Sequence, residues 1–155
     1  MIYWEDFTLQ KTANIDSPIR LQGYYYSITD EGYDPFGFFY QNGVFIEIRG
    51  SNFKNFEEMD TIIQNAFINS KRYMSDRMIW GLYTIQDSII RIETYYHISA
   101  FERCSSMLMG NIINDTTFIV HYLSIPYKKE VRKFENNYKY FRAFTPKPDS
   151  TQTFF

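Results

Sequence analysis

The chain has 155 residues and a formal net charge of −2, and 45% of its residues are hydrophobic. This length predicts one domain, the apolar content argues against disorder, and the near-neutral charge disfavours a general nucleic-acid binder, which would be clearly basic. No run of residues approaches the ~20 apolar positions of a membrane-spanning helix. Aromatic residues make up 20% of the chain, and because they favour pleated, half-buried surfaces, they indicate a β-rich fold.

The first part of the chain alternates between apolar and polar residues, which predicts three strands, over residues 19–28, 36–41 and 44–49. A cluster of turn residues at 29–35 separates the first two. Asn42-Gly43 lies between the second and third, and this dipeptide is a strong hairpin signal because a type I′ turn needs positive φ at both central residues.

Residues 55–74 interrupt the alternation with apolar residues at helical spacing. Asn55 can cap the start of a helix, and Glu58, three residues later, can complete a capping box. The sequence therefore predicts one inserted amphipathic helix at about 55–74.

Five further strands are expected after this helix, over residues 78–86, 89–98, 103–113, 116–123 and 138–144. Residues 126–135 are expected to form a charged loop. Short connections favour antiparallel neighbours, and eight such strands can close into an up-and-down barrel. A two-sheet sandwich is the main alternative. We expect a single domain over residues 1–155, with an N-terminal extension at 1–18 and a C-terminal tail at 146–155.

Five short segments carry a resemblance to a known family: residues 19–26, 39–43, 80–85, 114–118 and 147–151. Together they resemble uncharacterised bacterial lipocalin-like proteins, which implies a small calycin-type β-barrel. The resemblance supplies no catalytic residues. Many such proteins are exported lipoproteins, so it implies a periplasmic or outer-membrane-anchored protein if a leader precedes Met1, and a cytoplasmic one otherwise.

Candidate catalytic and metal-binding residues are few. His97 and His121 are the only histidines and lack close ligand spacing, and Cys104 is the only cysteine, with no catalytic motif around it. Glu47 and Glu93 lie on the polar sides of alternating strands, which is typical of a solvated exterior. Phosphate loops, nucleophile elbows and zinc-helix motifs are absent. We therefore expect no catalytic residue, no metal, no cofactor and no enzymatic activity.

Basic and aromatic residues are interleaved from Tyr127 to Arg142, a pattern found on single-stranded nucleic-acid surfaces. Glu130 and Glu135 dilute the charge, so a charged loop followed by a final strand is the preferred interpretation, and no nucleic-acid partner is expected.

Aromatic side chains are the remaining functional signal, because a tyrosine inside a cavity offers an apolar ring with a polar hydroxyl. Eight of them are expected to face the barrel interior and to contact a ligand: Tyr25, Phe38, Tyr40, Trp80, Tyr96, Tyr122, Tyr138 and Tyr140. The sequence thus predicts a non-enzymatic protein that binds a small apolar or amphipathic molecule in the barrel. The alternative is a structural or protein-interaction module whose barrel is filled by its own rings and holds no small-molecule ligand. The identity of any protein partner stays open.

Overall fold

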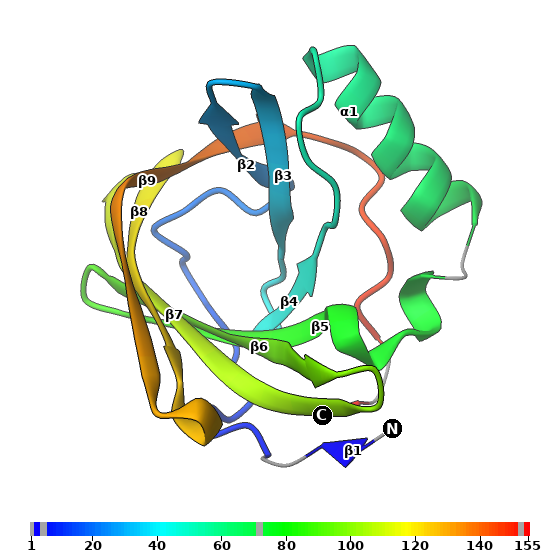
Figure 1. Cartoon of the computed structure of the whole chain (residues 1–155). Coiled ribbons are helices and arrows are strands. Elements are labelled where there is room, and N and C mark those ends of the chain that lie inside the picture. Colours follow the sequence, from blue (N-terminus) through cyan, green and yellow to red (C-terminus); the bar gives the residue numbers. More distant parts are fainter. Residues whose placement is uncertain (1, 4–5, 71–72, 152–153) are drawn as a thin grey trace.

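The computed structural model describes residues 2–3, 6–70, 73–151 and 154–155. Eight antiparallel strands form a closed barrel in which each strand pairs with its neighbour in sequence and the first pairs with the last (Figure 1). They are β2 (Gly23–Thr29), β3 (Gly32–Phe39), β4 (Val44–Glu47), β5 (Trp80–Gln86), β6 (Ile89–Ser99), β7 (Glu102–Asn114), β8 (Thr117–Ile125) and β9 (Glu130–Ala143). The predicted eight-stranded up-and-down barrel is confirmed. A short extra strand, β1 (Ile2–Tyr3), pairs in parallel with β7 outside the barrel.

Two strands begin earlier than the sequence predicted. β3 starts at Gly32, inside the expected turn, because Pro35 lies at a register shift between β2 and β3, where a missing backbone N–H is tolerated. β9 starts at Glu130, so the expected charged loop is mostly strand. The charged residues at the start of β9 pair with β8 from Ile125↔Glu130 onward. A 3-10 turn connects β8 to β9 and ends at Lys129, which has φ 52°.

The hairpin between β3 and β4 forms where expected, but its turn differs from the predicted type. Gly43 N donates to Tyr40 O at 3.0 Å, which places Gln41 and Asn42 at the centre of the turn. Gly43 has φ 90°, whereas Asn42 is not among the residues with positive φ. The glycine is therefore needed just after the turn, where a left-handed residue returns the chain to the strand.

The inserted helix is confirmed but shorter than expected. α1 (Phe56–Ile63) continues through a π-helical turn, Gln64–Asn69, and ends where Ser70 becomes extended. Residues 71–72 lie outside the described residues, and Tyr73–Ser75 form a separate 3-10 turn, followed by another at Arg77–Ile79. Asn55 caps the helix as predicted, accepting from Glu58 N at 2.8 Å. Among the described residues, no helix is long and apolar enough to cross a membrane.

Two hydrophobic clusters lie on opposite faces of the barrel strands, an inner layer inside the barrel and an outer layer under the helix. The inner layer is a cluster of buried residues inside the barrel: Ile19, Tyr25, Phe39, Phe45, Tyr83, Ile90, Ile92, Phe118 and Val120. Its rings touch one another, for example Phe39 and Tyr83 at 4.8 Å between ring centroids, and Tyr25 and Phe118 at 5.3 Å. Packed rings of this kind leave little room for a ligand at the centre of the barrel.

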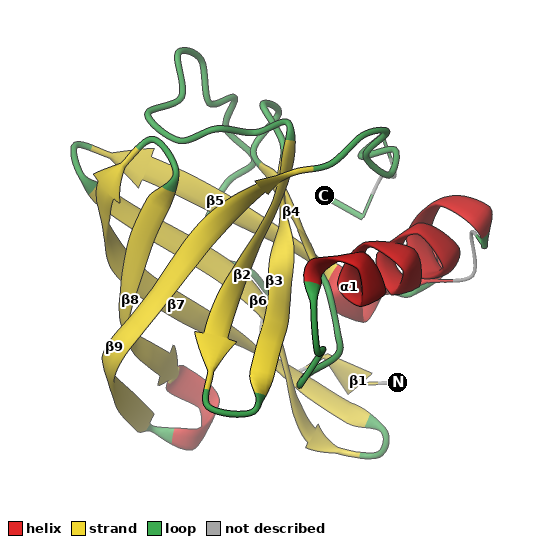
Figure 2. Ribbon diagram, turned by 90° about the horizontal axis from the view of Figure 1, so that it is seen from above, coloured by secondary structure: helices red, strands yellow, loops and turns green. Residues whose placement is uncertain are grey.

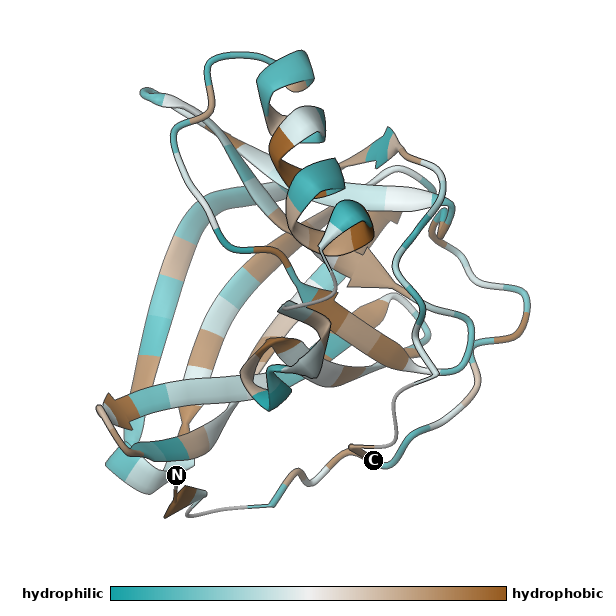
Figure 3. Cartoon of the chain, turned by 90° about the vertical axis from the view of Figure 1, so that its right-hand side faces the viewer, coloured by the Kyte–Doolittle hydropathy of each residue, from teal (hydrophilic) through white to brown (hydrophobic). Residues whose placement is uncertain are grey.

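The outer layer lies between the barrel and the helix. Met59, Ile63 and Phe67 pack in one cluster with strand residues such as Phe38 and Trp80. Figure 2 shows the helix outside the strands, and Figure 3 shows largely hydrophobic strand segments behind it. Asp60 fastens this helix to β9 and β2, because it accepts from Arg142 Nη2 at 2.6 Å and from the Tyr24 hydroxyl at 2.7 Å.

Candidate functional site

The barrel wall opens between β2 and β9. These strands pair only from Gly23↔Ala143 to Tyr26↔Tyr140. Beyond that point β2 continues along β3, and β9 continues along β8. The gap is a cavity of about 470 Å³, which we call the side slot; its lining includes Ser27, Asp34, Pro35, Phe134, Asn137 and Lys139.

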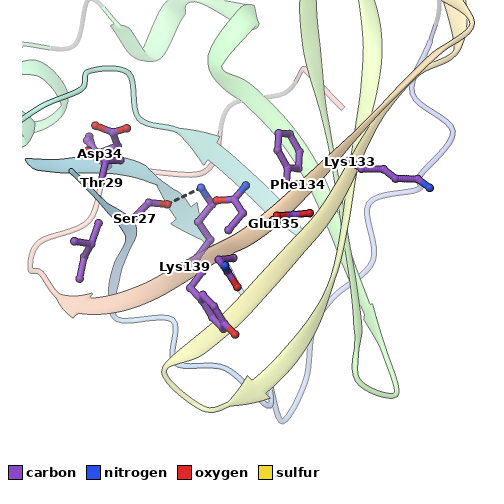
Figure 4. A pocket seen from close by; sticks show the side chains of 12 residues that line it. Ser27, Thr29, Asp34, Lys133, Phe134, Glu135 and Lys139 are labelled. Atoms are coloured by element: carbon purple, nitrogen blue, oxygen red, sulfur yellow. Dashed lines mark hydrogen bonds between the residues drawn. The ribbon is translucent and has the colours of Figure 1, made fainter. Parts of the chain in front are cut away.

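Lys139 is the central polar group of the side slot. It pairs across the sheet with Phe118, an inner-layer residue, so its side chain points inward. Its Nζ donates to Ser27 Oγ at 2.7 Å, across the gap between β9 and β2 (Figure 4). The same nitrogen lies 4.5 Å from the centroid of the Phe36 ring. Burial lowers the pKa of Lys139 to about 8, and the nearby Asp34 carboxylate opposes this shift.

A second lysine with the same pKa has a different environment. Burial also lowers the pKa of Lys147 to about 8. Its Nζ donates to two backbone oxygens, Leu21 O and Phe39 O, each at 2.6 Å, and lies 4.0 Å from the centroid of the Tyr40 ring. Lys147 therefore fastens the C-terminal tail to the barrel, whereas Lys139 has a single hydrogen-bond acceptor among the described residues.

The other charged groups of the side slot are engaged elsewhere or lie at its rim. Asp34 Oδ1 accepts from Asn52 N at 2.8 Å and so holds the segment that leads to the helix. Lys133 and Glu135 line the slot from exposed positions on β9. The slot is therefore lined mostly by polar side chains, with Ile28, Pro35 and Phe134 as its apolar part.

Neither glutamate that was expected on a solvated exterior lies there. Glu47 alternates with Phe45 on β4 and so faces the barrel interior, where burial raises its carboxyl pKa against the opposing effect of Arg49. Glu93 is only 2% exposed. Its carboxylate accepts from Thr8 N at 2.9 Å and from Leu9 N at 2.8 Å. The prediction failed for Glu93 because the N-terminal segment covers the outer face of β6, and for Glu47 because its side of β4 is the inward one.

The eight predicted ligand contacts do not share one face of the wall. Tyr25 lies in the inner layer, and Tyr96 alternates with Ile92 on the inward face of β6. Phe38, Tyr40 and Trp80 belong to the outer layer under the helix and the tail, which corrects their expected inward orientation.

The three remaining tyrosines also lie outside the barrel, contrary to expectation. The Tyr122 hydroxyl donates to Met109 Sδ at 2.7 Å on the outer face of β7 and β8. Tyr138 and Tyr140 stack at 6.3 Å between ring centroids, and Tyr140 contacts the outward-facing Tyr26. Of these three, Tyr138 lines the side slot.

The remaining chemical candidates are dispersed. His97 is exposed, His121 Nε2 lies 2.9 Å from Asn111 Oδ1, and Cys104 is fully buried. Within the described ranges, no three His, Cys, Asp or Glu side chains gather as metal ligands would. The basic residues of β9 also separate: Arg132 contacts the Tyr96 hydroxyl at 2.8 Å, and Lys139 enters the slot.

No family model, curated protein or solved structure matches the chain. The lipocalin-like relationship therefore stays a prediction.

Proposed function

We propose that the protein is a non-enzymatic binder of a small amphipathic molecule, and that the side slot is its ligand site. The observation that carries this proposal is a partly buried amine that has a single hydrogen-bond acceptor among the described residues and lines a cavity whose many polar side chains are joined by Ile28, Pro35 and Phe134. An amphipathic ligand needs polar groups that orient it and apolar surface for its body. The volume of about 470 Å³ lies within the range of ~300–1,000 Å³ usual for small-molecule sites.

The position of the site differs from the one expected from the sequence. Rings of the inner layer occupy the middle of the barrel, so a ligand there would have to displace well-packed side chains, which costs stability. The side slot requires no such displacement. Lys139 and Ser27 would contact the polar end of the ligand, and Pro35 and Phe134 its apolar part.

Native mass spectrometry of the purified protein, with a denatured mass of the same sample, tests this proposal. We expect excess mass that is lost on denaturation, or a rise in melting temperature with a panel of small amphipathic molecules. Lys139→Met should weaken this binding or stabilisation, whereas Lys54→Met, at an exposed lysine outside the slot, should preserve it. Absence of any bound or stabilising molecule would reject the proposal.

A protein-interaction module is the second candidate function. It is favoured by the outer face of β8 and β9, where Tyr122, Tyr138 and Tyr140 are all partly exposed. If no small molecule binds, this tyrosine-bearing face becomes the surface to test against protein partners.

A further inference from the structure

The contrast between two buried lysines points to covalent chemistry in the side slot. We propose that the Lys139 amine captures small aldehydes reversibly as an imine, so that the ligand class of the slot includes carbonyl compounds. This inference rests on the proposed function, because the slot must first admit the ligand.

Geometry separates Lys139 from the other buried lysine. Both lysines line cavities, Lys147 one of about 740 Å³ and Lys139 the side slot of about 470 Å³. Lys147 donates to two backbone oxygens and packs on an aromatic ring, so its attack on a carbonyl carbon would break both of these bonds and release the tail. Among the described residues, Lys139 donates only to the Ser27 hydroxyl, so its nitrogen is more easily freed for a ligand. A small aldehyde can therefore approach the amine of Lys139 through the slot.

The environment of Lys139 also favours the reactive neutral form. With its pKa lowered to about 8 by burial, about half of the Lys139 amine is neutral at pH 8, against less than ~1% for an ordinary lysine. Desolvation of this kind activates lysine amines toward carbonyl groups. The facing groups are Ser27 on β2, Asp34 and Phe36 on β3, and Phe118 on β8. Asp34 is the charged one among them, and it favours the protonated amine.

On β9 itself, Lys133, Glu135 and Tyr138 are the titratable residues that line the slot. Lys133 and Glu135 are exposed at its rim, where solvent screens their effect on the amine.

The proposed step balances without an oxidant or reductant. The lone pair of Lys139 Nζ forms a bond to the aldehyde carbon, and the π electrons of the carbonyl group move to its oxygen. Ser27 Oγ accepts a hydrogen bond from Nζ and can pass a proton from the nitrogen to that oxygen. Loss of the second N–H proton and of the hydroxyl group as water then leaves a C=N bond. One aldehyde and one amine thus give one imine and one water, and addition of water reverses the reaction.

Reductive trapping with benzaldehyde and cyanoborohydride at pH 8, followed by peptide mapping, tests this inference. We expect a benzyl group on Lys139 in roughly tenfold or greater excess over exposed lysines, because far more of its amine is neutral. Lys147 should remain unmodified although its pKa is the same. The modification rate should rise from pH 6.5 to pH 8.5 and then level off.

Matched variants and a non-reactive analogue separate the possible outcomes. Lys139→Arg keeps the charge but cannot form an imine, so it should abolish the adduct, whereas Lys54→Arg, at an exposed lysine outside the slot, should leave it unchanged. Equal modification of Lys139 and Lys147, or modification that follows exposure alone, would overturn the inference. Binding of benzyl alcohol without an aldehyde adduct would overturn it while leaving the proposed function intact. Failure of both benzyl alcohol and benzaldehyde to bind would reject both.

Discussion

Replacing Phe118 with alanine should strongly destabilise the barrel. Phe118 is 0% exposed, and its ring centroid lies 5.3 Å from that of Tyr25, 5.7 Å from Phe39 and 6.0 Å from Phe36. Truncation would remove a fully buried ring and leave a cavity among aromatic neighbours that are themselves fixed in strands. Such a change costs about 3–5 kcal/mol of unfolding free energy.

Urea denaturation measures this loss from the shift of the unfolding midpoint at constant slope. Val131→Ala is the matched control, because Val131 is 60% exposed and its truncation should change stability by less than ~0.5 kcal/mol. Benzene should partly restore the stability of Phe118→Ala but leave the wild type unchanged, since a dry apolar cavity binds apolar molecules. A loss below ~1 kcal/mol would refute the conclusion that rings fill the barrel centre.

Three further predictions concern the other buried features. Because Lys139 and Lys147 have pKa values lowered to about 8, these two lysines bind more protons in the unfolded chain than in the folded chain around and above pH 8, whereas the raised pKa values of buried tyrosines such as Tyr24 and Tyr25 act in the opposite direction as the pH approaches 10. Stability in urea should therefore rise by about 1–2 kcal/mol from pH 7.5 to pH 9, after discounting for solvent screening, and Lys139→Met should reduce this rise; a flat profile would contradict it. Asp60→Asn weakens the contact with Arg142, whose side chain, like that of Asp60, is 30% exposed, and should cost about 1–2 kcal/mol; unchanged stability would show that the helix docks without this pair. Gly110→Ala should cost about 1–3 kcal/mol, because a Cβ there would overlap a backbone oxygen of β8; wild-type stability on denaturation would contradict the close approach of the two strands.

Local patterns were sufficient to predict most of the barrel strands and the start of the helix. Alternation identifies a strand whichever way its faces point, and Asn55 caps the helix through a bond that spans only three residues. The first half of β9 was missed because its charged residues suggested a loop, although pairing with β8 makes it a strand.

Alternation could not tell the inside of the barrel from the outside. Phe38 and Phe39 are 0% and 1% exposed, yet they lie in the outer and inner layers respectively. Because the helix and the tail cover one side of the barrel, both faces of these strands are apolar, and the inward-facing rings could not be chosen from the sequence.

The side slot exists because the pairing between β2 and β9, two strands far apart in sequence, ends at Tyr26↔Tyr140. Ser27 and Lys139 are separated by 112 positions in sequence, and they meet because β2 and β9 diverge after Tyr26↔Tyr140. One local signal was present: Tyr138 and Tyr140 alternate with Lys139, so a strand with both tyrosines outside must turn the lysine inward. The sequence-based interpretation turned the tyrosines inward and so missed it.

An NMR titration of the labelled protein with benzyl alcohol tests the central claim most directly, because backbone amide shifts locate a bound small molecule. We predict that the largest shifts lie at Ser27, Phe134 and Asn137, around the side slot, and that they diminish in Lys139→Met. Largest shifts at the inner-layer residues Phe39 and Tyr83 would contradict the claim that the ligand binds beside the filled barrel centre rather than within it.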